Sequence, residues 1–253
     1  MKTSAIGWTD FSGGDLNFVT GCTPVSEGCQ NCYARAIYKR WGRDFDTVTI
    51  HEDKLHRLYR RMSGGYSPKR GPGHWPMAFV CDTGDLFHPD VPDEFILSAV
   101  TMMAYREDVS WQVLTKRPER MRDWYAQYGY QYQLGGESNI WLGVTAENQA
   151  RADERIPLLL DTPAAVRFVS VEPMLGPVDL RRYLRGAQHL SWLICGAESG
   201  PRRRPFDIQW ARDLWVYCHC AGVAYFGKQD SGLKPGTPLL VGDGDTVIHE
   251  WPQ

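Results

Sequence analysis

The stretch IWLGVTAENQARADERIPLLLDTPAAVRFVSVEP, residues 140–173, contains the pattern that decides the fold. An apolar run is followed by a helix-like segment, QARADERIPLLLDT, and then by a second apolar run, VRFVSVEP. Both apolar runs have the length of a strand and are hydrophobic nearly throughout, which is typical of strands buried on both faces. Strand, helix and strand in this order predict a βαβ unit with parallel strands and a right-handed crossover.

The same alternation recurs along the chain. Six apolar runs of strand length are expected to form strands: residues 76–82, 110–117, 140–148, 166–173, 190–199 and 223–229. Helix-like segments lie between them, one of which places Pro92 and Asp93 in its first turn and another of which ends at Gly222. The pattern predicts an α/β fold, a partial (β/α) barrel of about six βα units.

Length and composition are those of one soluble domain, and we expect a single domain over residues 1–253. Residues 43–75 fit the alternation poorly and are expected to leave the barrel as a basic helix and a loop. From about residue 232 a turn and a short hairpin are expected as a C-terminal extension. No apolar run is long enough to span a bilayer and the N-terminus lacks a signal-peptide core, so we expect a cytoplasmic protein without membrane association.

Three of the seven cysteines lie close together in VTGCTPVSEGCQNCYARA, residues 19–36. The spacing of Cys22, Cys29 and Cys32 is C-x6-C-x2-C, after an expected strand and before an expected helix. An odd number of cysteines in a reducing compartment argues against a disulfide framework. Three thiolates indicate either a zinc site completed by a distant histidine or a 4Fe-4S cluster with one open iron.

The remaining cysteines are weaker candidates for a fourth ligand. Cys81 and Cys195 lie within expected strands and have the character of small core residues. Cys218 and Cys220 lie on an expected helix, where they point in different directions. For zinc, four histidines remain as candidates: His51, His56, His74 and His88.

Almost every expected strand ends on polar or ionisable residues, and in parallel α/β folds these ends meet at the functional edge of the sheet. Taken together, the ionisable groups at this edge indicate a site, because lone charges at a barrel mouth cost free energy unless they are paired or used.

A cysteine loop after the first strand of a partial barrel resembles the radical S-adenosylmethionine (SAM) superfamily. More closely, the chain resembles an uncharacterised phage- and bacterium-encoded family of radical-SAM-like proteins. The segments that carry this resemblance are GWTD, TGCTPVSEGCQNCYA, DLFHPDVPDE, VLTKRPERM, WLGVTAENQARADERIPLL, RFVSVEPMLGPV, CGAESGPRRRPFDIQWARDL and VAYFGKQ. Six residues lie between the first two cysteines here, whereas the superfamily usually has three.

The resemblance implies a 4Fe-4S cluster, SAM as second cofactor, and hydrogen abstraction from an unidentified substrate. The implied iron ligands are Cys22, Cys29 and Cys32. The implied SAM ligands are Asp82 and Asp85 for the ammonium, Lys116 or Arg117 for the carboxylate, and Thr145, Glu147 and Asn148 for the ribose. The implied substrate-side residues are Glu172, Glu198 and Lys228. Tyr33 is expected to pack against the cluster.

A reductant of the flavodoxin or ferredoxin type would supply the electron, and nucleic acid is a candidate substrate. Two basic groups suggest phosphate binding, the first with interleaved aromatic rings. The first comprises Arg60, Arg61, Lys69 and Arg70, with Tyr59, Tyr66 and Trp75; the second comprises Arg202, Arg203 and Arg204. The net charge of only −2 favours an ordinary solvated basic face over a phosphate-binding surface. The alternative function is a non-catalytic module that uses zinc or a cluster structurally or for interaction.

Overall fold

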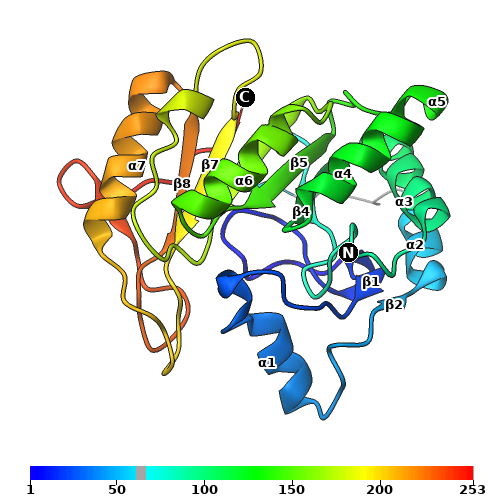
Figure 1. The fold of residues 1–253 in the computed structure, drawn as a ribbon, viewed down its shortest axis with the longest axis horizontal. Coiled ribbons are helices and arrows are strands. Elements are labelled where there is room, and N and C mark those ends of the chain that lie inside the picture. The colour runs from blue at the N-terminus through cyan, green and yellow to red at the C-terminus, as the bar shows by residue number, and fades with distance from the viewer. Residues whose placement is uncertain (61–66, 253) are drawn as a thin grey trace. The chain divides into compact units, whose positions relative to one another are not determined.

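A computed structural model describes residues 1–60 and 67–252 of the chain (Figure 1). Its central feature is a six-stranded sheet in which the strands follow one another in chain order, β3-β4-β5-β6-β7-β8. The strands are β3 Met77–Phe79, β4 Ser110–Thr115, β5 Ile140–Thr145, β6 Val166–Val171, β7 Trp192–Gly196 and β8 Ala224–Gln229. They coincide with the six expected runs, and the predicted α/β partial barrel is confirmed.

The chain divides into two compact units, and the division falls within β5. The first unit comprises residues 1–25, 32–142 and 162–165. In it β3 pairs in parallel with β4, and a separate antiparallel pair joins β1 Val19–Thr20 to β2 Thr49–Ile50. Its helices are α1 Tyr33–Arg40, α2 Glu52–Leu58, α3 Asp93–Tyr105, α4 Pro118–Trp124 and α5 Tyr130–Tyr132, with a 3₁₀ turn η1 Gly14–Leu16 and a π turn η3 Tyr125–Gly129.

The second unit comprises residues 26–31, 143–161 and 166–253. In it β6, β7 and β8 pair in parallel, and helix α7 lies beside β7 and β8 (Figure 1). Its helices are α6 Gln149–Leu160 and α7 Ile208–Ala221, with 3₁₀ turns η2 Glu27–Cys29 and η4 Arg181–Tyr183. A C-terminal antiparallel pair joins β9 Leu240–Gly242 to β10 Thr246–Val247.

Helix boundaries follow from capping chemistry that the sequence carries. The Asn148 side chain accepts a hydrogen bond of 3.0 Å from the Arg151 amide and begins α6, and Asp207 does the same for Gln209 at the start of α7. Helix α7 ends at Gly222, whose φ of 70° is the left-handed conformation that glycine adopts at no steric cost. Helix α3 begins at Asp93, directly after Pro92.

The expected strand before the cysteines exists as β1, but it pairs with β2 and does not join the six-stranded sheet. The described part of residues 43–75 contains β2 and α2, and the expected excursion from the barrel stays a prediction. In the described parts of the chain, no helix is both long and apolar enough to cross a membrane.

Candidate functional site

The cysteine motif is distributed over the two units: Cys22 and Cys32 lie in the first and Cys29 in the second. All three are half-buried cysteines outside any disulfide, whereas Cys81, Cys195 and Cys218 are buried and Cys220 is exposed. Burial raises the pKa of the Cys195 thiol to about 12, which is the behaviour of an inert core residue. Among residues 1–60 and 67–252, no three His, Cys, Asp or Glu side chains are arranged to hold a metal ion.

In the first unit, Arg117 follows β4 and lies against the first cysteine. Its Nη1 is 3.4 Å from the Cys22 sulfur and 2.9 Å from Oδ2 of Asp85, and its Nη2 donates to the Thr23 carbonyl at 2.9 Å. Burial lowers the pKa of Arg117, but the Asp85 carboxylate and the Cys22 sulfur outweigh burial and raise that pKa above its ordinary value. A buried cation in this position stabilises the thiolate form of a cysteine.

Asp85 is committed to the same cluster of contacts. Both its carboxylate oxygens accept from the Thr115 hydroxyl, at 2.8 and 3.0 Å, and the Asp85–Arg117 ion pair is nearly buried, with exposed side-chain fractions of 6% and 10%. The structure therefore brings together Asp85 and Arg117, two residues expected to bind SAM separately. Their part in binding SAM remains a prediction.

Asp82 and Lys116 differ from Asp85 and Arg117, because each has a charged atom without a hydrogen-bond partner among the described residues. Oδ1 of Asp82 is buried and has no hydrogen-bond partner among the described atoms. Burial raises the pKa of Asp82, although Asn17 and Ser12 partly oppose this effect. Lys116 is half-buried, and within the described part of the chain its ammonium makes no hydrogen bond or ion pair. An unpaired carboxylate oxygen and an unpaired ammonium can receive the two charged ends of an amino acid.

Tyr33, directly after the last cysteine, is 52% exposed and donates a hydrogen bond from its hydroxyl to the Asp82 carbonyl. It therefore links the start of α1 to the end of β3. Whether it also shields a cluster stays a prediction.

In the second unit, two of the expected SAM ligands at the end of β5 contact residues 26–31. Glu147 is fully buried, pairs with Arg155 at 3.0 Å, and accepts from the Gly28 amide at 3.2 Å. The Asn148 side-chain amide donates to the Glu27 carboxylate, while its oxygen caps α6. Thr145 is buried, and its carbonyl accepts from Arg155 at 2.8 Å.

The three expected substrate-side residues form two ion pairs. Glu172 pairs with Lys228 at 2.9 Å, joining the ends of β6 and β8. Glu198, after β7, pairs with Arg204 at 2.5 Å. Burial raises the pKa of Glu198, but the hydrogen bonds from Arg204 and Asn31 outweigh burial and hold that pKa below its ordinary value.

Sequence reasoning missed Arg155, Arg204 and Asn31 as members of the site. Arg155 lies on an otherwise amphipathic helix, and its place on the apolar face is the signal that could have shown it to be buried. Arg204 was grouped with Arg202 and Arg203 as a basic patch, because a run of arginines gives no indication of which one turns inward.

Most cations of the two basic groups are used within the protein. Lys69 donates to the carbonyls of Ile6 and Thr9, and the Arg70 guanidinium lies 4.9 Å from the centre of the Trp141 ring. Arg203 donates to Ser231 at 3.1 Å. Arg61 and Tyr66 lie outside the described residues. These two groups therefore offer less free charge than the sequence indicated.

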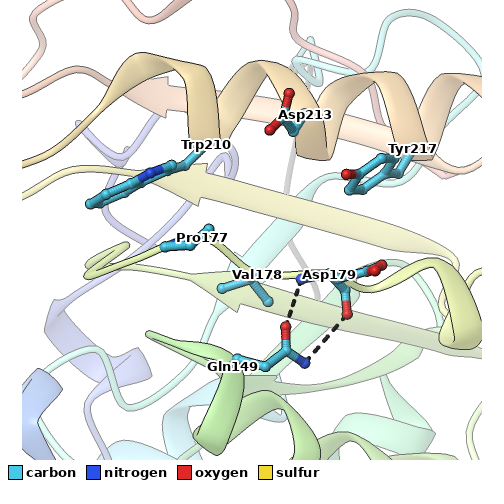
Figure 2. A pocket seen from close by; sticks show the side chains of 7 residues that line it. All are labelled: Gln149, Pro177, Val178, Asp179, Trp210, Asp213 and Tyr217. Carbon is cyan, nitrogen blue, oxygen red and sulfur yellow. Dashed lines mark hydrogen bonds between the residues drawn. The ribbon is translucent and has the colours of Figure 1, made fainter.

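A separate open pocket of about 370 Å³ lies in the second unit, between α7, the start of α6 and the loop after β6 (Figure 2). Gln149 holds that loop by accepting from the Asp179 amide at 2.7 Å and donating to the Asp179 carbonyl at 3.4 Å. Trp210 and Tyr217 reach into the pocket from α7. None of the residues expected to bind a cofactor or substrate lines it.

Comparison with known proteins identifies related structures and one family. Residues 3–237 match the family described as "Protein of unknown function (DUF5131)". Comparison with curated proteins finds no match. The fold is similar to that of spore photoproduct lyase complexed with dinucleoside spore photoproduct, with a TM-score of 0.51 and 10% identity over 92% of this chain and 78% of that one. Two single-residue mutants of spore photoproduct lyase, with TM-scores of 0.50 and 0.51, match at the same identity and coverage.

Proposed function

The chain belongs to the DUF5131 family. We propose that it is a radical SAM enzyme that abstracts hydrogen from an unidentified substrate. The observation that carries the proposal is the set of three half-buried thiols within residues 22–32, one of them beside the guanidinium of Arg117. The partial-barrel fold, shared with spore photoproduct lyase, supports it. The electron would come from a flavodoxin- or ferredoxin-type reductant.

The chemistry of the three thiols fits the implied cofactors, although the described structure does not gather them around one point. Cys22, Cys29 and Cys32 would hold a 4Fe-4S cluster, because three cysteine ligands leave one iron open for SAM. When bound, the cluster and SAM would supply one-electron reductive cleavage of SAM and, through it, hydrogen abstraction. The Asp82 oxygen without a partner suits an ammonium group and Lys116 suits a carboxylate.

The protein's own residues would then bind and orient. Arg117 would place its positive charge beside the Cys22 sulfur, and Asp85 would hold Arg117 in place through the nearly buried ion pair. Glu172 and Lys228 remain the candidates for the substrate side, because their ion pair lies at strand ends and Lys228 is still 29% exposed. The ribose contacts expected of Thr145, Glu147 and Asn148 remain predictions.

The experiment that tests the proposal is anaerobic purification with iron and sulfide analysis, followed by incubation with SAM and dithionite. We expect a brown protein with about four irons per chain that forms 5′-deoxyadenosine. A protein that binds iron and sulfide but never cleaves SAM would contradict the enzymatic part of the proposal.

Nucleic acid or a nucleotide is the substrate class that the free surface charges favour. Lys39 and Arg40 end helix α1, and their side chains have no ion-pair or hydrogen-bond partner in the described residues; the adjacent Trp41 is 58% exposed. Cations beside an exposed ring suit phosphates and bases. We expect salt-dependent binding of single-stranded DNA or RNA that the Lys39→Glu/Arg40→Glu variant weakens, and no binding at low salt would exclude this class.

A second candidate function, a non-catalytic zinc module, is favoured by one contact. Nε2 of His88 lies 2.8 Å from the hydroxyl of Thr23, the residue after Cys22. Burial and the neighbouring Arg117 lower the pKa of His88, which favours the neutral imidazole that binds metals. A colourless protein with one zinc per chain, no sulfide, and zinc loss in His88→Ala would establish this alternative.

A further inference from the structure

Cys29 lies in the 3₁₀ turn η2, and none of the residues of this turn is buried. A turn of this length gains little from its own hydrogen bonds, since 3₁₀ geometry is poor and short helices are marginal. Two such bonds are present: the Cys29 amide donates to the Ser26 carbonyl at 3.0 Å, and the Gln30 amide to the Glu27 carbonyl at 3.2 Å. Polar contacts from outside the turn are therefore needed to fix the position of Cys29.

The first of these contacts comes from the end of β5. Oε1 of Glu147 accepts from the Gly28 amide at 3.2 Å, while its Oε2 is held by Arg155 at 3.0 Å. The fit at this point is tight, because a Cβ added to Gly28 would lie only 2.9 Å from the Glu147 carboxylate. Gly28 therefore allows the turn to approach the buried carboxylate as closely as it does.

The second contact comes from the end of β7. Oε2 of Glu198 accepts from the Asn31 side-chain amide at 3.0 Å and from the Arg204 amide at 2.8 Å. The Arg204 guanidinium, paired with Glu198, also donates to the Glu27 carbonyl at 2.9 Å. The two carboxylates thus hold residues that come before and after Cys29 in the chain.

Glu172 provides a comparison at the end of β6. Its exposed side-chain fraction is 13%, against 8% for Glu198, and it too forms an ion pair, at 2.9 Å with Lys228. Its other hydrogen-bond partner among the described residues is the Ser170 hydroxyl, so its contacts do not include residues 26–31. The carboxylates at the strand ends of this unit therefore differ in whether they contact residues 26–31, although their burial and ion pairing are similar.

We propose that Glu147 and Glu198 are positioning residues that hold Cys29 in place before any metal or cluster binds. The proposal rests on the proposed function only in giving Cys29 the role of a ligand. It also explains the six residues between Cys22 and Cys29, because a loop of this length brings residues 26–31 into contact with the Glu147 and Glu198 carboxylates. It also gives Glu198 the role of positioning residues 26–31, in place of the substrate-side role expected from the sequence.

The first test is hydrogen–deuterium exchange on the full-length, metal-free protein, comparing Glu198→Ala with the matched variant Glu172→Ala. Loss of charge-assisted hydrogen bonds should speed amide exchange in the peptide that contains residues 26–31 by about tenfold or more in Glu198→Ala. Glu172→Ala should leave this peptide unchanged, and Glu198→Gln, which keeps an acceptor oxygen, should give an intermediate rate. Equal rates in Glu198→Ala, Glu172→Ala and the unaltered protein would overturn the proposal.

The second test is independent of charge and compares Gly28→Ala with Gly176→Ala. The added methyl in Gly28→Ala meets the Glu147 carboxylate, whereas nothing lies within 4 Å of a Cβ at Gly176. Only Gly28→Ala should speed exchange of residues 26–31, and thermal melting of both variants shows whether the fold is intact. If Gly28→Ala melts like the unaltered protein and exchanges at its rate, Glu147 does not position the turn.

Iron binding then separates this proposal from the proposed function. After reconstitution with iron and sulfide, Glu198→Ala should retain less than about half the iron of Glu172→Ala, because an ordered ligand costs less entropy to bind. If the unaltered protein binds no iron while the exchange differences are present, the proposed function fails and the positioning role stands. If the unaltered protein and Glu198→Ala bind iron equally, with equal exchange rates, the positioning role fails alone.

Discussion

The guanidinium of Arg117 lies 3.4 Å from the sulfur of Cys22, and the same guanidinium forms a nearly buried ion pair with Asp85. One arginine thus contacts both a buried carboxylate and a cysteine sulfur. Effects on stability and on metal binding can be separated, because the ion pair and the sulfur contact depend on different partners.

Removing Arg117 should be costly, since it leaves the buried Asp85 carboxylate without its counter-ion. We expect Arg117→Gln to lower the free energy of unfolding by about 3 kcal/mol, and Arg117→Gln/Asp85→Asn to recover much of that loss. Urea unfolding of the four proteins of this double-mutant cycle measures both effects. The exposed Arg35–Asp46 pair is the control, and Arg35→Gln should cost less than about 1 kcal/mol. Equal costs for the two arginines would contradict the burial argument.

Asp82 should make stability depend on pH in a definite direction. Burial raises its pKa in the folded protein above the ordinary value of 3.8, so the folded state binds this proton more tightly than the unfolded state. Stability should therefore fall as pH rises from about 4 through the raised folded pKa, and Asp82→Asn should remove this loss. In urea unfolding across this range and up to neutral pH, the free energy of unfolding of Asp82→Asn should rise relative to that of the unaltered protein as pH rises. A difference that shrinks with rising pH would show that the sign is wrong.

The three cysteines of the motif should be separable from the others by metal analysis. Serine at position 22, 29 or 32 removes one thiolate ligand, so we expect each variant to lose most of its iron and sulfide after anaerobic reconstitution. Cys220→Ser is the control, because Cys220 is exposed on α7. Iron loss in Cys220→Ser, or full iron in any of the three, would contradict the assigned ligand set.

Gly143 in β5 tests the packing of the second unit. A Cβ at this position would lie 2.4 Å from the ring of Phe168, which is fully buried. We expect Gly143→Ala to lower the free energy of unfolding by about 1–3 kcal/mol and Phe168→Leu in the same chain to recover part of it. Thermal or urea unfolding measures the change, and Gly176→Ala is the unstrained control. A neutral Gly143→Ala would mean that β5 and β6 are more loosely packed.

The sheet could be predicted because its information is local. Runs such as Trp192–Gly196 are apolar on both faces, and this property together with their short length favours buried parallel strands. The polar residues that follow, among them Glu172 and Glu198, were located at strand ends for the same reason. The end of α7 could be predicted for the same reason, since Gly222 acts on its own neighbours.

The partners of those strand-end residues could not be predicted, because each depends on where a distant loop returns. Glu172 and Glu198 both follow apolar strands, yet one binds Lys228 and the other binds Arg204 and Asn31. Arg117 and Asp85 were both expected to bind SAM, and the chain gives no local sign that they face each other. Spacing in sequence identifies which groups reach an edge, whereas tertiary packing decides which of them are already paired.

The closeness of Gly28 to Glu147 has a consequence for how this protein can change over evolution. A larger residue at position 28 collides with the carboxylate, and a shorter residue at position 147 leaves the Gly28 amide without this acceptor and Arg155 without its carboxylate partner. A substitution at either position alone should therefore destabilise the loop, so we expect the two positions to covary among homologous chains. The same coupling means that the cysteine loop cannot be transplanted into another barrel unless the residue that follows the equivalent of β5 moves with it.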